Sequence, residues 1–255
     1  MPWNPETYLS FASERTQPAL DLVTRITLPE PRRIIDLGCG PGNSTQLLQQ
    51  RWPTAEITGL DNSPEMLATA RKAHPTWRWV QGDTAEWTSP TPYDLIFSNA
   101  ALQWVPRHTE VLPRLLQQVT ANGALAVQMP ATYHAPVHGL MRDLAKDPAW
   151  RDRLRPATRA VLVEKPPFYY DLFSQLVSRL DIWETEYIHA LDQHEGIVDW
   201  MRGTGLRPYL EALASDDQRT RFESLLLDEI RRVYPRQRDG RVLFPFRRLF
   251  FIAYR

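Results

Sequence analysis

The sequence has one cysteine and no long apolar run, and each shortage excludes a class of protein. Cys39 is the single cysteine among 255 residues, so no disulfide can form within the chain. We therefore expect a reducing, cytoplasmic setting. No apolar run has the length that spans a bilayer, and the first residues lack the basic and then apolar pattern of a secretory signal. We expect no membrane association.

An excess of charge is also absent. Thirty basic residues balance 30 acidic ones, which gives a formal net charge of zero. Dedicated nucleic-acid-binding proteins usually carry a basic excess, so we expect no nucleic-acid partner. The hydrophobic fraction of 43% and the charged fraction of 24% are ordinary for a globular protein and argue against extended disorder.

The first half of the chain alternates short apolar runs with segments of helical length. The segments 44–52, 64–73 and 109–120 have helical length, and the last repeats its apolar residues at helical spacing. This alternation predicts a parallel sheet covered by helices on both faces. The apolar runs, which we expect to be strands, lie at 33–37, 56–61, 78–83, 93–99 and 124–129.

After Pro130 this alternation stops. Residues 131–180 contain several prolines and no strand pattern, whereas 181–188 alternate as in a strand and 248–254 form a last apolar run. We expect a single domain over 1–255, whose helical insertions lie over the carboxyl ends of the strands and form a substrate cap. Its expected parts are a cofactor-binding core with an N-terminal helix at 1–130, cap insertions at 131–180 and 194–240, and return strands at 181–190 and 246–255.

A glycine-rich segment follows the first expected strand. It contains Gly38, Gly40 and Gly42, preceded by Asp36. Glycines let a strand-to-helix turn bend tightly and let a ligand approach backbone N–H groups. The dinucleotide fingerprint would place its third glycine where this sequence has Asn43. A tight turn that binds no ligand is the alternative at this point.

Polar residues also end the next three strands. Asp61 ends the second, where an acid can accept both hydroxyls of a ribose. Asp83 ends the third, where a carboxylate can meet an adenine amino group, and Asn99 ends the fourth. Each alone could cap a helix. Together with the glycine segment they predict a nucleoside-containing ligand at one edge of the sheet.

The segments DLGCGPGNST, GLDNSPEML, QGDTAEW and DLIFSNAALQWV, in this order, resemble the class I S-adenosylmethionine-dependent methyltransferases. The resemblance implies an α/β fold with a Rossmann-like, doubly wound sheet of seven strands, mostly parallel with the last strand antiparallel. It also implies S-adenosylmethionine as the cofactor, S-adenosylhomocysteine as the product and no metal. The cofactor-binding residues that it implies are Asp36, Gly38, Cys39, Gly40, Asn43, Asp61, Asn62, Met66, Asp83, Thr84, Asn99, Ala100 and Trp104.

Further segments, from Trp3-Asn-Pro-Glu to Leu249-Phe, resemble the trans-aconitate 2-methyltransferase family. The segment Gly203–Leu210 is the most specific of them, whereas Ala131-Thr132 stand where the family tends to have Asp-Asn. The resemblance implies that one carboxylate of a small tricarboxylate is converted to its monomethyl ester.

A carboxylate acceptor would need no catalytic base, because it is already ionised at neutral pH. The enzyme would need to align the acceptor with the methyl group, exclude water and hold the other carboxylates. Arg207 and Tyr209 follow two glycines and could form a carboxylate receptor at the start of a helix; the alternative is a surface arginine beside a turn. Weaker candidates for substrate binding are Arg15, Tyr187, Trp200, Trp104 and Arg241.

Other patterns give weaker hypotheses. His134 and His138 are four residues apart, but Pro136 between them disfavours a zinc-binding helix. The segment Lys165–Phe168 superficially resembles a motif of DNA methyltransferases but follows the fifth strand rather than the fourth. Methylation of an amine or a hydroxyl, and a cofactor-binding module without catalysis, remain alternatives. We expect a monomer.

Overall fold

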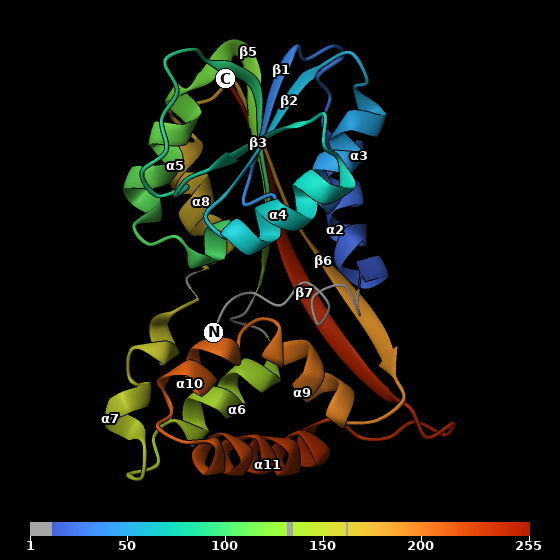
Figure 1. Cartoon of the computed structure of the whole chain (residues 1–255), viewed down its shortest axis with the longest axis vertical. Helices are drawn as coiled ribbons and strands as arrows, with labels where there is room; N and C mark the ends of the chain where they lie inside the picture. Colours follow the sequence, from blue (N-terminus) through green and yellow to red (C-terminus); the bar gives the residue numbers. More distant parts are fainter. Residues whose placement is uncertain (1–11, 132–134, 162) are drawn as a thin grey trace. The chain divides into compact units, whose positions relative to one another are not determined.

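A computed structural model describes residues 12–131, 135–161 and 163–255, with the side chains of 12–15 and 159 left aside. The chain forms two compact units (Figure 1). The sheet unit contains the described residues up to Pro130 together with Glu164–Thr185 and Arg248–Arg255. The helical unit contains the described residues of the range Ala131–Val163 together with Glu186–Arg247. The first expected insertion, 131–180, is therefore divided between the two units.

The sheet unit is built on a seven-stranded sheet with the order β3-β2-β1-β4-β5-β7-β6. The pairs β1–β2, β1–β4, β2–β3 and β4–β5 are parallel, as the alternation of strands and helices predicts, and β5–β7 is antiparallel, as the family resemblance implies. The strands are β1 (Arg33–Leu37), β2 (Glu56–Asp61), β3 (Arg78–Gln81), β4 (Tyr93–Asn99), β5 (Val119–Pro130), β6 (Arg179–Leu191) and β7 (Val242–Tyr254).

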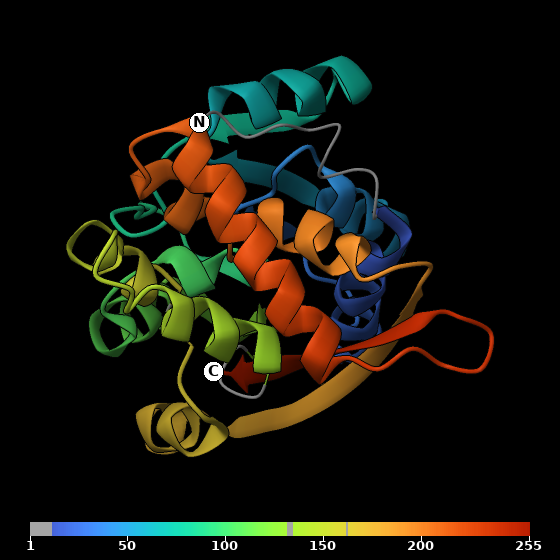
Figure 2. The same ribbon diagram turned by 90° about the horizontal axis from the view of Figure 1, so that it is seen from below.

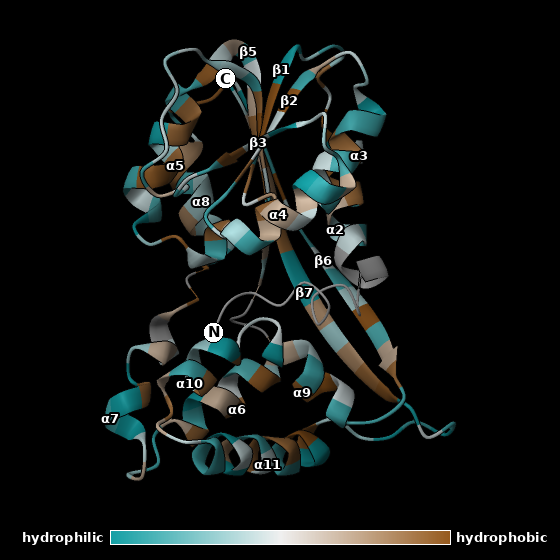
Figure 3. Cartoon of the chain, viewed as in Figure 1, coloured by the Kyte–Doolittle hydropathy of each residue, from teal (hydrophilic) through white to brown (hydrophobic). Residues whose placement is uncertain are grey.

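Helices cover both faces of this sheet. In Figure 1, α2 and α3 lie on one side of the strands and α5 and α8 on the other. The central strands β4 and β5 are buried almost throughout, which explains their continuous apolar sequence (Figure 3). The helices of the unit are α2 (Ala12–Arg25), α3 (Asn43–Arg51), α4 (Pro64–Ala73), α5 (His108–Gln117) and α8 (Pro166–Phe173), with the short 3-10 helix η1 (Leu102–Trp104).

Local signals set the ends of several elements. The Ser63 side chain accepts a hydrogen bond from the N–H of Met66, and Pro64 occupies the first turn, so α4 begins where its sequence predicts. The expected helix 109–120 is too long, because α5 ends at Gln117 and β5 begins at Val119. The carbonyl of Gln118 accepts a hydrogen bond from the N–H of Tyr93, which draws the chain into the sheet at this point.

The helical unit packs around aromatic side chains. Trp200 is fully buried and contacts the rings of Phe244, Phe246 and His189. Helix α11 lies against α6 and α9, and its apolar positions form one face (Figures 2 and 3). The helices of this unit are α6 (Pro136–Leu144), α7 (Arg151–Leu154), α9 (Glu195–Arg202), α10 (Arg207–Ala212) and α11 (Asp216–Val233), with the 3-10 helix η2 (Ala157–Arg159).

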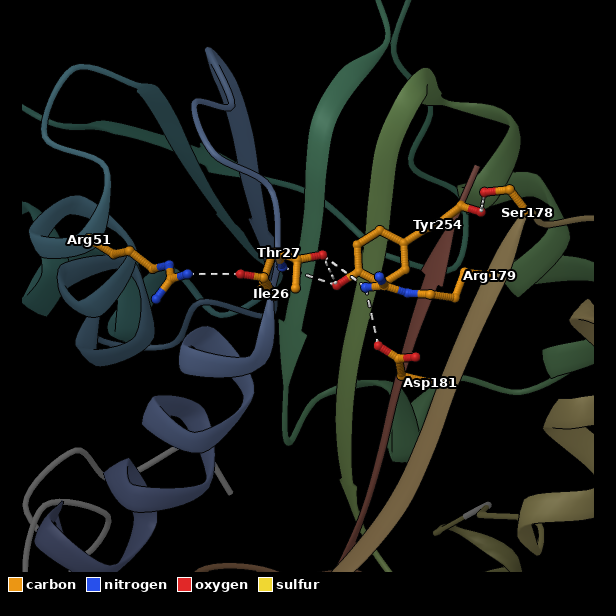
Figure 4. A network of polar contacts seen from close by, with 7 residues as sticks. All are labelled: Ile26, Thr27, Arg51, Ser178, Arg179, Asp181 and Tyr254. Atoms are coloured by element: carbon orange, nitrogen blue, oxygen red, sulfur yellow. Dashed lines mark hydrogen bonds and ion pairs between the residues drawn. The ribbon is translucent and has the colours of Figure 1, made fainter.

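A polar network within the sheet unit joins the end of α2 to the last strand (Figure 4). The Tyr254 hydroxyl accepts hydrogen bonds from the N–H and the hydroxyl of Thr27, both at 3.1 Å. The Arg179 guanidinium donates to the Thr27 hydroxyl at 2.8 Å and lies 3.9 Å from the centre of the Tyr254 ring. One tyrosine therefore holds segments 227 residues apart in the sequence.

We expect Tyr254→Phe to lower the free energy of unfolding by about 1–2 kcal/mol, because the Thr27 N–H loses its acceptor. Urea denaturation monitored by tryptophan fluorescence measures this change. Tyr170→Phe is the matched control, because this tyrosine is 58% exposed. Equal stability of the two variants would contradict the structural role of the hydroxyl.

Candidate active site

The glycine segment between β1 and α3 is held against the end of β2. The N–H groups of Gly38 and Cys39 both donate to the carbonyl of Leu60, at 2.7 and 3.0 Å. Gly38, Gly40 and Gly42 have φ angles of 73°, 55° and 99°, a region that favours glycine. A Cβ atom at Gly38 would lie 2.1 Å from the Cβ of Ala101, whereas one at Gly40 would meet no atom within 4 Å. The loop therefore packs tightly at Gly38 and faces open space at Gly40.

Asp36 lies beneath this loop and is completely buried. Its Oδ2 accepts hydrogen bonds from the hydroxyls of Ser44 and Thr45, both at 2.7 Å, which ties β1 to the first turn of α3. Its Oδ1 is buried and has no hydrogen-bond partner. Burial raises the pKa of Asp36 to about 6, although the two hydroxyls act in the opposite direction.

Asp61 connects the glycine loop to α4. Its Oδ2 accepts from the N–H of Gly40 at 2.8 Å, and its Oδ1 accepts from the N–H of Ser63 at 2.9 Å. Burial raises the pKa of Asp61, and the backbone hydrogen bonds act against this shift. Each carboxylate oxygen still has lone pairs that can accept hydrogen bonds from hydroxyl groups of a ligand.

The remaining residues expected near an adenine ring follow β2 and β3. Met66 and Thr84 are buried, whereas Asn62 and Asp83 are exposed. The Oδ1 of Asp83 accepts from the N–H of Ala85 at 2.8 Å, so this carboxylate also caps the turn after β3. Cys39 is buried in the loop, and burial raises the pKa of its thiol, which argues against a nucleophilic role.

The end of β4 provides unpartnered polar atoms. The Oδ1 of Asn99 is buried without a hydrogen-bond partner, and Ala100 has a φ angle of 53°, which strains a residue other than glycine. The Nε2 of Gln103 donates to the carbonyl of Ala100 at 2.6 Å and stabilises this turn. Asn43 and Trp104, which begin α3 and end η1, are half-buried.

The substrate candidates of the helical unit have contacts within that unit. Arg207 donates to Glu211 at 2.9 Å within α10. The N–H groups of Thr204 and Leu206 both donate to the carbonyl of Met201. These two donors of the turn before α10 therefore already have an acceptor within the turn. Tyr209 is buried against Phe222.

The other substrate candidates differ in their exposure. Trp200 belongs to the aromatic core, and Tyr187 is half-buried on β6. Arg241 is exposed and pairs with Asp192 at 3.5 Å. Arg15 lies in α2, but its side chain is outside the described residues.

Two buried polar residues of the sheet unit were not expected as site residues. Gln128 on β5 is completely buried, and Arg248 on β7 is 5% exposed. Each lies inside an apolar run, where the sequence gives no sign of which face of the strand it occupies. Only the strand pairing shows that they lie near the carboxyl ends of β4 and β5.

Comparison with known proteins identifies the family. The family model for a methyltransferase domain matches residues 34–123. A trans-aconitate 2-methyltransferase of Azoarcus sp. (strain BH72) is 46% identical over 253 residues, which cover 99% of each chain. A relative of the same name from Rhodopseudomonas palustris (strain BisA53) is 44% identical over 98% of each chain.

The chain belongs to the trans-aconitate 2-methyltransferase family. The sequence-based expectation of an S-adenosylmethionine-dependent methyltransferase is thereby confirmed. Solved structures of lower identity agree in fold. The YcgJ protein from Bacillus subtilis has a TM-score of 0.62 at 16% identity and covers 94% of this chain and 98% of its own. Phosphoethanolamine N-methyltransferase 2 of Haemonchus contortus, solved in complex with S-adenosylmethionine, has a TM-score of 0.57 at 13% identity and covers 93% of this chain and 52% of its own.

The geometry fits the cofactor of this methyltransferase family. The open space at Gly40, the free lone pairs of Asp61 and the unpartnered Asn99 oxygen lie along the loops that follow β1, β2 and β4. At Gly40 a ligand can approach the backbone closely, and the Asp61 oxygens can accept hydrogen bonds from ribose hydroxyls. The Asn99 oxygen is the negative end of an amide dipole, which suits a positively charged group. In residues 12–131, 135–161 and 163–255, no group of three or more His, Cys, Asp or Glu side chains could hold a metal ion. His134 of the suggested zinc pair lies outside these residues.

We expect Gly40→Ala to fold and to bind S-adenosylhomocysteine at least about tenfold more weakly, because its methyl group occupies the open space. The positive φ angle adds a stability cost of about 1–2 kcal/mol. Gly38→Ala is the comparison, since its Cβ would clash with Ala101 and reduce stability further. Calorimetric titration and urea denaturation separate the two effects, and unchanged affinity in Gly40→Ala would remove the loop from the cofactor site.

We expect Asp36 to make stability fall as the pH rises from about 4 to about 7. The pKa of about 6 in the folded protein exceeds the ordinary aspartate value of 3.8, so the folded state binds the proton more tightly. This contribution is complete below pH 3.8 and is lost as the pH rises through 6, by roughly 3 kcal/mol. Urea denaturation at several pH values should show this loss for the wild-type protein relative to Asp36→Asn. A constant difference between the two proteins would contradict the raised pKa.

Proposed function

We propose that this protein transfers a methyl group from S-adenosylmethionine to one carboxylate of trans-aconitate or a related small tricarboxylate, and releases S-adenosylhomocysteine and the monomethyl ester. The observation that carries the proposal is the match of 44–46% identity to relatives named trans-aconitate 2-methyltransferase, which extends over both units of the chain. The cofactor, when bound, supplies a methyl group attached to a positively charged sulfonium.

The loops after β1, β2 and β4 would hold this cofactor. Gly38, Gly40 and their backbone would contact its methionine part, Asp61 would accept the ribose hydroxyls, and Asn99 would lie near the sulfonium. Further contacts are expected from Asp36, Cys39, Asn43, Asn62, Met66, Asp83, Thr84, Ala100 and Trp104. The burial of Asp36, Cys39, Met66 and Thr84 and the hydrogen bonds within the loops support this assignment, because a preorganised site loses little freedom when its ligand binds.

The acceptor carboxylate needs no proton removed before it reacts. Its oxygen forms a bond to the methyl carbon while the sulfur–carbon bond breaks and leaves its electron pair on sulfur. The protein would hold the acceptor in line, exclude water and bind the other carboxylates. Approximation of this kind can contribute about 7–11 kcal/mol to the rate. We propose Arg207 and Tyr209 as substrate-binding residues, with Arg15, Tyr187, Trp200, Trp104 and Arg241 as further candidates.

A hydroxyl or amine acceptor would need a base, and His108, which contacts the segment after β4, is engaged within the fold. The Nε2 of His108 lies 2.9 Å from the carbonyl of Leu102, which can only accept, so Nε2 carries the proton. Its Nδ1 then accepts from the Tyr169 hydroxyl at 3.0 Å. Burial lowers the pKa of His108, in agreement with this neutral form. Both ring nitrogens are used within the fold, which favours an acceptor that is already ionised.

No helix in the described part of the chain combines the length and apolarity that a membrane crossing requires. We propose a monomer that acts on a small molecule in the cytoplasm, which agrees with the single cysteine and the balanced charge.

The decisive experiment incubates the purified protein with methyl-labelled S-adenosylmethionine and a panel of acceptors. The panel contains trans-aconitate, cis-aconitate, isocitrate, citrate, a monocarboxylate and an amine. We expect base-labile label on trans-aconitate, as an ester requires. Label on the amine alone would establish the alternative acceptor class, and cofactor binding without any transfer would favour the module without catalysis.

The pH dependence gives a second test. With a carboxylate acceptor, we expect kcat to be constant between about pH 7 and pH 9, since neither substrate nor enzyme must lose a proton in this range. A hydroxyl or amine acceptor would instead give a rate that rises with pH. Initial rates of S-adenosylhomocysteine formation at saturating substrate distinguish the two profiles.

A further inference from the structure

Gln128 carries a buried amide that the fold itself does not use. Its side chain has no exposed surface, and neither Oε1 nor Nε2 has a hydrogen-bond partner. The backbone at this position is satisfied, since its carbonyl accepts from the N–H of Ala100 at 3.0 Å. The side chain is therefore the unexplained part of this residue.

Strand pairing places Gln128 beside the cofactor loops. It lies opposite Asn99 in the parallel pair β4–β5, so both side chains leave the sheet on the same face. Asp36 shares this face, because it pairs with Phe97, two residues before Asn99. Three neighbouring strands thus carry buried carboxyl or amide atoms without partners, and those of Asn99 and Gln128 lie close to the carboxyl ends of their strands.

A buried cation lies on the next strand of the same face. Gln128 is opposite Phe250 in the antiparallel pair β5–β7, and Arg248 is two residues away from Phe250. Arg248 is therefore the diagonal neighbour of Gln128, about 7–8 Å away, which a long side chain can bridge. Arg248 is 5% exposed as a residue, so solvent screens its charge little.

An amide buried without partners is unfavourable for folding, and buried polar groups are nearly always hydrogen-bonded. A ligand that enters the site can supply the missing partner. The loops after β1, β2, β3 and β4 are assigned to the cofactor. The neighbouring edge, formed by the end of β5 and the paired part of β7, is therefore the part of the sheet that remains for the methyl acceptor. An amide N–H beside a guanidinium is a donor set suited to a carboxylate.

We propose that the Nε2 of Gln128 binds a carboxylate of the acceptor, with Arg248 as its charged neighbour. The inference rests on the proposed function and names a residue that orients the substrate of that reaction. The amide contributes a neutral hydrogen bond, and the guanidinium contributes the charge that attracts a polyanion. Gln128 contacts the substrate in this assignment and transfers no proton.

The test is Gln128→Met, which keeps the volume of the side chain and removes its polar atoms. We expect trans-aconitate to bind about tenfold to a hundredfold more weakly to the complex of this variant with S-adenosylhomocysteine. Affinity for S-adenosylhomocysteine itself should change less than about threefold. The ligand-free variant should unfold at the same urea concentration as the wild-type protein or a higher one, because an unpartnered amide has been removed.

Gln118→Met is the matched control, at the residue between α5 and β5. The Oε1 of Gln118 accepts from the N–H of Ser89, so we expect this variant to lose stability and to keep its substrate affinity. Gln128→Asn retains the amide on a shorter side chain, and we expect it to fold and to bind trans-aconitate more weakly.

The outcomes separate the two proposals. If the wild-type complex binds trans-aconitate and Gln128→Met binds it equally well, the assignment of Gln128 is overturned while the proposed function stands. Loss of stability in Gln128→Met with unchanged affinity would show that the amide has a structural role. If the wild-type complex binds no acid of the panel, the proposed function is wrong. The proposal that Gln128 binds a carboxylate is then wrong as well.

Discussion

The two hydrogen bonds that Asp61 accepts organise the edge of the sheet on which the site is built. One fixes the glycine loop after β1 through Gly40, and the other fixes the start of α4 through Ser63. The preceding carbonyl, of Leu60, accepts two more N–H groups from the same loop. The last two residues of β2 therefore hold both segments that the cofactor would contact. Burial disfavours the Asp61 carboxylate, and the backbone donors that it orders also stabilise its charge.

The same edge shows how stability and function oppose each other. Asp36, Asn99 and Gln128 each carry a buried polar atom without a hydrogen-bond partner, and each such atom costs about 1–3 kcal/mol in the ligand-free protein. Buried polar atoms without a partner also occur away from this edge, at Arg114 and Gln118, but each of these two side chains makes another hydrogen bond within the fold. Gln128 differs from these two residues because neither polar atom of its side chain has a partner, and it lies at the edge where a ligand can supply one.

The sheet and the cofactor loops could be predicted from the sequence because their signals are local. The apolar runs of β1, β2 and β4 end at polar residues or glycines, and their predicted bounds agree with the structure. Periodicity misplaced the boundary between α5 and β5, because the apolar spacing of the helix continues into Val119. Gln128 and Arg248 could not be found in this way. Their importance depends on which strands become neighbours, and a single strand carries no record of that pairing.

Burial also decides how much each cation can contribute to binding of a polyanionic substrate. Arg241 pairs with Asp192 at the surface, where solvent and salt screen its charge, so its effect on an anion is small. Arg248 is buried, and its field acts in a medium of low polarity. A guanidinium bound directly to the reacting oxygen would, however, withdraw the electron density needed for attack. A neutral amide withdraws less electron density, so Gln128 can orient a carboxylate of the acceptor while Arg248 beside it supplies the positive charge, which is a physical reason for pairing the two residues at this edge.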